Sequence, residues 1–337
     1  MLRARQGATV WLLAAVLTFA LFLSLCIGAV RISPLQVFTS LTGGDGGDSG
    51  ILLGIRLPRV LLAGLVGADL AVAGAVLQGV FMNPLADPYV LGVSSGASLG
   101  AVIVIAFNPQ FTLGGLGALP LFAMVGALLT ILVVQHLASV DGRASVTGLL
   151  LAGVAASAFL SAAISGVAYA SGNRVHQVWL WLVGGFSNAG WDLVTMALPY
   201  SVAGLACSIV LARDLNAMVL GEETATHLGV NVNLVRNVLV WTASLLTAVS
   251  VASSGIIGFV GMVIPHICRM VGPDHRFLVP ASALAGAAAT VLADTAGRTI
   301  LAPQEIPVGI ITSLVGGPFF LYLLRQNQRT RRGNPGA

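Results

Sequence analysis

The sequence predicts an all-α polytopic membrane protein with about ten transmembrane helices, forming a single domain over residues 1–337. Composition supports this fold class, because 57% of the residues are hydrophobic and only 8% are charged, which is far from a soluble domain. The mean hydropathy is +0.95. The apolar residues also form continuous runs, unlike the alternating pattern of a transmembrane β-barrel.

The charged and sulfur-bearing residues exclude several classes of protein. All sixteen basic residues are arginine. A P-loop needs a lysine at the nucleotide phosphates, so the chain cannot be its own Walker-type ATPase. The three cysteines lie in or beside apolar runs and suggest neither a disulfide framework nor a metal site. No HExxH or triad pattern is present, so an intramembrane enzyme has little support, and no catalytic residue or cofactor is predicted.

The predicted helices begin with an apolar run over 9–30, which lacks the small-residue cleavage site of a signal peptide. The clearest feature follows, a helix hairpin over about 57–81 and 90–107 that is interrupted by the polar turn 83–88. Its many glycines and alanines let helix backbones approach closely. The remaining spans are predicted at about 118–138, 145–170, 190–212, 234–253, 256–271, 277–297 and 305–324.

The arginines predict the orientation, because cytoplasmic loops carry an excess of positive charge. Ten spans put both termini on one side. If that side is the cytoplasm, eleven of the sixteen arginines face it. The outer side then holds Arg31, Arg56, Arg59, Arg174 and Arg298.

Two stretches do not span the membrane. Residues 172–186 are predicted to form a short external helix, with Trp179 and Trp181 at the membrane interface. Residues 213–233 form the longest polar segment on the inner side and read as two short amphipathic helices around the turn at Gly221. A solvated loop is the alternative, but the spaced apolar residues favour a docking surface for a cytosolic partner.

Three acidic residues, Asp69, Asp294 and Glu305, are predicted at membrane depth, where such groups usually face a partner or a cavity. Asp294 and Arg298 are four residues apart, which is an ion-pair spacing on a helix, and Glu305 falls near the same end. We favour a structural role for these three over a substrate or proton path. Asp69 has no obvious partner and its role is left open.

In addition, the chain resembles the FecCD-type permease subunits of bacterial ABC importers for iron-siderophores, haem and cobalamin. The resemblance covers nearly the whole chain. It rests on RLPR (56–59), GADLAVAGAVLQGVFMNPLADPYVLGVSSGASLGA (67–101), LGVNV (228–232), SGIIGFVGMVIPHICRMVGPDHR (254–276), AD (293–294) with Arg298, and QEIPVGIITSLVGGPFFLYLLR (304–325).

The resemblance implies a type II ABC importer permease fold in the bacterial inner membrane, with both termini cytoplasmic. It implies a homodimer with the substrate pathway along its axis, two cytosolic ATP-binding subunits, and a periplasmic binding protein that delivers a metal chelate. Nucleic acid is not among the partners it implies.

Site residues follow by position from the same resemblance. Arg56, Arg59 and Arg298 match arginines that receive acidic residues of the binding protein. The stretch 213–233 matches the segment that couples to the ATPase. Within it we expect the coupling residues Leu220, Gly221, Glu222, Glu223, Leu228 and Gly229. The inner-gate and pathway residues are expected to be Asn83, Leu85, Ser145, Thr147, Ser157 and Ser161.

The substrate is not specified by these motifs. Iron chelates are the favoured class, with haem and siderophore about equal and cobalamin third. His136, His176 and Arg174 give weak support for haem. A proton-coupled secondary transporter is the rival from another class, with Asp69 or Asp294 carrying the proton. The 213–233 segment discriminates between them, because such a carrier has no need of it.

Overall fold

The computed structural model describes residues 2–28, 32–43, 49–109, 112–113, 115–140 and 143–333. Arg31, one of the arginines expected on the outer side, lies outside this set. Ten main helices coincide with the ten predicted spans. They are α1 (Leu2–Cys26), α4 (Leu57–Val80), α5 (Val93–Phe107), α6 (Ala118–Ala138), α7 (Val146–Ala170), α9 (Trp191–Val210), α12 (Val232–Ser254), α13 (Val260–Val271), α14 (His275–Thr299) and α15 (Val308–Gly333).

Short elements connect these helices. Helices α2 (Pro34–Leu41) and α3 (Ser49–Ile51) and the π turn η1 (Leu52–Arg56) precede α4, and the 3-10 turn η2 (Pro88–Leu91) precedes α5. The stretch 172–186 contains the 3-10 turn η3 (Gly172–Arg174) and α8 (Val175–Val183), and the stretch 213–233 contains most of α10 (Ala212–Val219) and all of α11 (Glu222–His227). Two antiparallel hairpins pair β1 (Thr112–Leu113) with β2 (Leu116–Gly117) and β3 (Ser139–Val140) with β4 (Arg143–Ala144).

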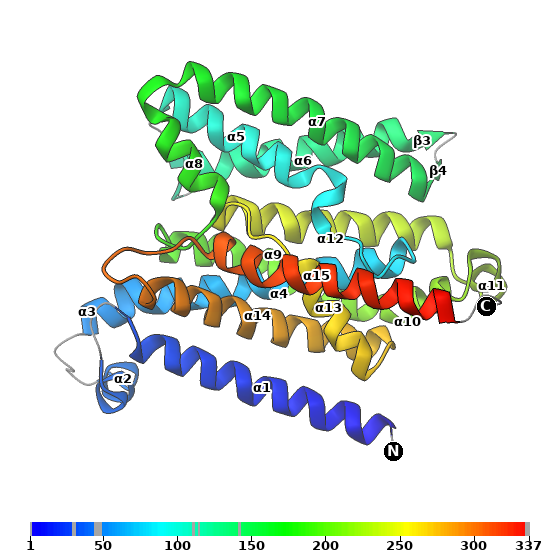
Figure 1. Cartoon of the computed structure of the whole chain (residues 1–337), viewed down its shortest axis with the longest axis horizontal. Coiled ribbons are helices and arrows are strands. Elements are labelled where there is room, and N and C mark those ends of the chain that lie inside the picture. The colour runs from blue at the N-terminus through cyan, green and yellow to red at the C-terminus, as the bar shows by residue number, and fades with distance from the viewer. Residues whose placement is uncertain are drawn as a thin grey trace.

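The helices lie roughly along one direction, and α1 begins at the same end of the bundle at which α15 finishes (Figure 1). We call this the termini end. Helices α10 and α11 also lie toward it, whereas α2, α3 and α8 lie at the opposite end, which we call the far end. Seven helical stretches in the described chain are long and apolar enough to cross a membrane, and the apolar parts of α5, α13 and α15 are shorter. The arrangement confirms the predicted all-α membrane fold.

Helix α4 forms the centre of the bundle and packs against α9, α12, α13 and α14. Glycine makes these contacts close. A Cβ atom on Gly74 would lie 1.6 Å from the carbonyl oxygen of Gly261 on α13, and one on Gly67 would lie 2.3 Å from that of Gly286 on α14. The small residues therefore allow direct backbone contact, as the composition of the hairpin predicts.

The segments that precede two of the shorter membrane helices, α5 and α13, contact each other. The predicted span 256–271 starts four residues too early, because residues 255–259 are not helical and α13 begins only at Val260. The hydroxyl of Tyr89, in η2 before α5, donates to the carbonyl of Ile257 at 2.9 Å and accepts from its N–H at 3.2 Å. This side chain satisfies backbone groups that a helix would otherwise pair, which an apolar environment requires.

Candidate functional site

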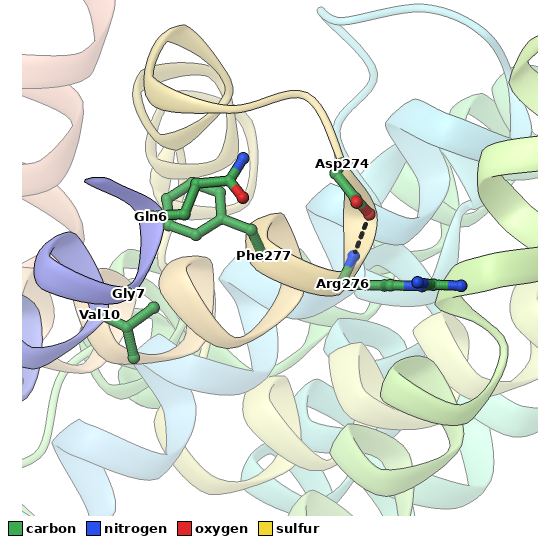
Figure 2. Close-up of a pocket in the computed structure, with 6 residues that line it drawn as sticks. All are labelled: Gln6, Gly7, Val10, Asp274, Arg276 and Phe277. Carbon is green, nitrogen blue, oxygen red and sulfur yellow. Dashed lines mark hydrogen bonds between the residues drawn. The ribbon is translucent and has the colours of Figure 1, made fainter. Parts of the chain in front are cut away.

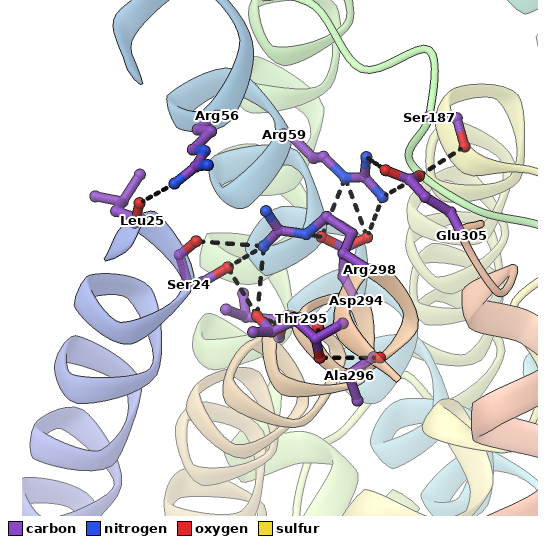
Figure 3. A network of polar contacts seen from close by, with 12 residues as sticks. Ser24, Leu25, Arg56, Arg59, Ser187, Asp294, Thr295, Ala296, Arg298 and Glu305 are labelled. Atoms are coloured by element: carbon purple, nitrogen blue, oxygen red, sulfur yellow. Dashed lines mark hydrogen bonds and ion pairs between the residues drawn. The ribbon is translucent and has the colours of Figure 1, made fainter. Parts of the chain in front are cut away.

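Charged side chains gather in one cluster at the far end of the bundle, between the start of α4 and the last turns of α14 (Figure 3). Arg56 and Arg59 come from the entry to α4, and Asp294 and Arg298 come from α14, which packs along α4. Glu305 comes from the loop that connects α14 with α15. The three arginines expected to dock a binding protein are therefore brought to one place.

Arg59 is the centre of this cluster. Its Nη2 atom lies 2.8 Å from Asp294 Oδ1 and 2.9 Å from Glu305 Oε2, and its Nη1 atom donates to Glu305 Oε1 at 3.1 Å. Its Nε atom donates to Asp294 Oδ2 at 3.1 Å. The Arg59 side chain is 12% exposed, that of Asp294 1% and that of Glu305 41%. Charge-assisted, two-pronged contacts of this kind fix geometry as well as contributing energy.

The other two arginines are buried against α1. Arg298 Nε lies 3.0 Å from Asp294 Oδ2, which confirms the ion pair predicted from their four-residue spacing. Its Nη2 atom also donates to the Ser24 hydroxyl at 2.7 Å, and Arg56 donates to the carbonyl of Leu25 at 2.9 Å. The contacts from the end of α1 were not predicted, because nothing in the sequence places that helix beside α14.

The 213–233 segment lies toward the opposite end of the bundle. Gly221 separates α10 from α11 with φ of +118°, a conformation that side-chain-bearing residues rarely adopt. Leu215 and Ala225 are buried, whereas Leu220 and Leu228 are 69% and 64% exposed. The segment therefore packs one apolar set against the bundle and presents another outward.

Two polar contacts anchor this segment to the membrane helices. Glu222, which like Glu223 is in the first turn of α11, forms an ion pair with the buried Arg236 of α12. Asn216 of α10 donates to Asp274 at 2.6 Å and accepts from the backbone N–H of His275 at 2.9 Å. From the sequence, Asp274 is recognisable only as a polar residue that precedes an apolar run. The side-chain bridge itself depends on tertiary packing.

Asp274 is also the N-cap of α14, since its carboxylate accepts from the Arg276 N–H at 2.9 Å. Burial acts to raise the pKa of Asp274, but this N–H, the Asn216 amide and the nearby positive charges outweigh it, so the pKa lies below its ordinary value. The carboxylate therefore stays ionised at neutral pH. A cavity of about 350 Å³ lies next to it and is lined by Gln6, Gly7, Val10, Asp274, Arg276 and Phe277 (Figure 2).

Four of the six expected gate and pathway residues, Ser145, Thr147, Ser157 and Ser161, lie at the start of α7 or within it. Ser145 caps α7 by accepting from the Gly148 N–H at 3.0 Å, and Ser145, Thr147 and Ser161 are exposed in the single chain. Ser157 is half-buried, and a Cβ atom on Gly92, at the end of η2, would lie 3.3 Å from its hydroxyl. Helix α7 thus packs beside the turn before α5.

The other two expected residues, Asn83 and Leu85, lie in the turn that connects α4 with η2. In this turn Asn83 is exposed, and its side chain accepts from the N–H of Leu85 at 3.0 Å.

The last of the expected coupling residues, Gly229, directly follows α11 and its C-cap Leu228. Its φ is +85°, in the left-handed region that favours glycine.

Two further residues were left open by the sequence. Asp69 is 3% exposed on α4 and accepts from the Ser201 hydroxyl of α9 at 2.6 Å, so it contacts another helix of the same chain. Arg174 donates to the last carbonyls of α5, those of Ile105 and Ala106, at 3.0 and 3.1 Å. These contacts give both groups a structural role and weaken the support that Arg174 lends to a haem propionate.

Comparisons with known proteins identify a family. The model of the FecCD transport family matches residues 16–326. An uncharacterised ABC transporter permease protein of Bacillus subtilis, YvrB, is 43% identical, with 94% of this chain and 93% of that protein covered. The hemin transport system permease protein HmuU of Yersinia pestis is 41% identical, over 93% of this chain and 95% of its own. The vitamin B12 import system permease protein BtuC of Escherichia coli is also 41% identical, over 95% and 96%.

A solved structure shares the fold. It is an inward-facing conformation assigned to the metal-chelate type of ABC transporter, and it superposes with a TM-score of 0.82 at 32% sequence identity. The match covers 95% of this chain and 99% of that one. The family match and the structural match therefore both cover almost the entire chain.

Proposed function

Because this chain belongs to the FecCD transport family, we propose that it is the membrane permease of an ATP-driven importer that carries an iron chelate, haem or ferric siderophore, into the cytoplasm. The full-length match to permeases of chelate and cobalamin importers carries this proposal. Cobalamin is the alternative cargo within the same family. The energy would come from separate ATPase subunits, since the chain has no P-loop lysine.

The segment formed by α10 and α11 is proposed to couple the permease to its ATPase. It offers the exposed Leu220 and Leu228 beside Glu223, and it is tied to α12 through Glu222 and Arg236 and to α14 through Asn216. A partner that moves this segment would therefore move two membrane helices with it. This is a rigid-body route from ATP hydrolysis to the gates.

The pathway is proposed to lie between two copies of the chain. Only Leu149 and Gly153 of α7 are buried, and the exposed remainder includes apolar side chains such as Phe159 as well as Ser161. A second copy facing α7 would enclose the small hydroxyl residues in a conduit. Weak polar groups suit a conduit because tight binding would hinder release.

The charged cluster at the far end is proposed to be where a periplasmic binding protein docks. The cluster contains three arginines and two carboxylates, so it keeps an excess of positive charge for acidic residues of a partner. This assignment places the far end outside the inner membrane and the termini end in the cytoplasm, in agreement with the distribution of arginines.

The rival function, a proton-coupled carrier, receives no support from Asp69. That carboxyl group is buried between α4 and α9 and accepts a hydrogen bond from Ser201. Asp294 is held by two arginines. Both acids therefore have partners within the chain that account for their burial.

Reconstitution of the permease with the ATPase and binding protein encoded beside it tests the proposal. Ferric siderophore, haem and cobalamin would be tested separately, and we expect one loaded binding protein to stimulate ATP hydrolysis. No association with an ATPase would overturn the importer function.

A Gly221→Pro variant tests the coupling segment, because proline cannot adopt the φ of +118° found there. We expect it to lose ATP-driven uptake while keeping a monodisperse membrane domain. Normal uptake would remove the coupling role.

A further inference from the structure

Arg59 has almost no hydrogen-bonding capacity left for a docking partner. A guanidinium carries five N–H groups. Nε and one N–H of Nη2 point to Asp294, while the other N–H of Nη2 and one of Nη1 point to Glu305. Only the second N–H of Nη1 lacks an acceptor among the described residues. A two-pronged contact with a new carboxylate therefore requires Arg59 to give up one of its present partners.

The two partners differ in how firmly they are held. Asp294 is 1% exposed and is also bound by Arg298, so removing it would leave buried charges uncompensated, which is costly. Glu305 is 41% exposed, and its other contact is a long hydrogen bond of 3.4 Å from the Ser187 hydroxyl. Water can hydrate this half-exposed carboxylate when it leaves Arg59, so exchanging it for another carboxylate costs much less than releasing the buried Asp294. Glu305 is therefore the partner that can leave.

Glu305 also approaches from the side that a partner would use. It belongs to the loop between α14 and α15 at the far end, and in Figure 3 it lies on the side of Arg59 away from Arg56 and α1. Ser187, its second contact, belongs to the connection between α8 and α9. Glu305 thus occupies the accessible face of Arg59, whereas Asp294 occupies the buried face.

We propose that Glu305 is an internal competitor for the docking site, which pairs with Arg59 in the free permease and is displaced when a carboxylate of the binding protein arrives. This inference rests on the proposed docking at the charged cluster. Displacement would free the α14–α15 loop from Arg59 and from the α8–α9 connection at the moment of docking. Competition by Glu305 thereby lowers the affinity of the permease for the binding protein. Its release on docking changes the contacts of the two loops, and so signals to the helices that carry them that the docking site is occupied.

The test compares two isosteric substitutions that remove one negative charge from the same end of the molecule. Glu305→Gln removes the negative charge of the competitor and keeps its size. Asp192→Asn is the matched control, because Asp192 is exposed in the first turn of α9 and forms no ion pair with the described residues. Wild-type and variant permeases in lipid nanodiscs would be titrated with the loaded binding protein encoded beside the permease, at low and high salt.

We expect Glu305→Gln to lower the Kd of docking about three-fold relative to Asp192→Asn, with the difference shrinking at high salt. Equal affinities in the two variants would overturn the inference while leaving the docking function intact. Weaker docking by Glu305→Gln would also overturn it, because Glu305 would then orient Arg59 for the partner. Failure of the wild-type permease to dock would instead overturn the docking function itself.

A second measurement does not depend on the partner. Phenylglyoxal modifies accessible guanidinium groups, and mass spectrometry would give the modification rate of Arg59. We expect this rate to rise several-fold in Glu305→Gln and to stay near the wild-type rate in Asp192→Asn. Unchanged labelling of Arg59 in Glu305→Gln would show that the negative charge of Glu305 does not hold this side chain over Arg59, which contradicts the inference.

Discussion

Helices α4 and α7 have similar lengths and similarly apolar sequences, yet they occupy opposite environments. Eighteen residues of α4 are buried, including Asp69 and Gln78, whereas only two residues of α7 are buried. Helix α4 reaches its neighbours through Gly67 and Gly74. Helix α7 lies at one edge of the bundle (Figure 1) and exposes serines together with large apolar side chains. Hydropathy alone therefore identifies a membrane helix but not what it faces.

The largest expected effect comes from placing side chains on equivalent glycines of the two helices. Gly74→Val would push a side chain into the backbone of Gly261, so we expect more than about 3 kcal/mol of destabilisation. Gly166→Val on α7 meets no atom within 4 Å and should change stability by less than about 0.5 kcal/mol. Thermal denaturation followed by size-exclusion chromatography measures both. Similar losses in the two variants would abolish the distinction between the helices.

Two arginine substitutions sharpen the comparison, because they test whether an exposed helix face contacts lipid or an aqueous pathway. Leu12 on α1 and Ser161 on α7 are both exposed in the single chain. Leu12→Arg should cost about 2.5 kcal/mol if that face contacts lipid, and the yield of inserted protein should fall. Ser161→Arg should insert normally and block uptake, because water in the pathway hydrates the charge. Equal losses of insertion would indicate that α7 faces lipid.

The smallest effect concerns single hydroxyl groups. Ser201→Ala removes the donor to the buried Asp69 carboxyl group and should cost about 1–2 kcal/mol, whereas Ser161→Ala should cost almost nothing. Uptake per folded molecule should be unchanged in Ser201→Ala, because the pair lies between α4 and α9. A loss of uptake at normal stability would instead support a transport role for Asp69.

The predictions from sequence succeeded best where the signal is local. The apolar runs gave ten helices, and the four-residue spacing of Asp294 and Arg298 gave an ion pair that the structure contains. Helix ends were predicted less well, as the start of α13 shows. There the chain leaves the helical path over 255–259 because the Tyr89 hydroxyl, from a distant part of the chain, satisfies the backbone of Ile257.

The sequence by itself determined the membrane character, the positions of the ten main helices and the family, because hydropathy and motif spacing are properties of neighbouring residues. Tertiary structure alone decided which charged and polar groups from distant parts of the chain meet. Arg59 contacts Asp294 and Glu305 across more than two hundred residues, and Asp69 finds Ser201 on another helix. A buried charge needs a partner, but which partner it finds depends on helix packing. That packing decides which acid on Arg59 is fixed and which can be exchanged.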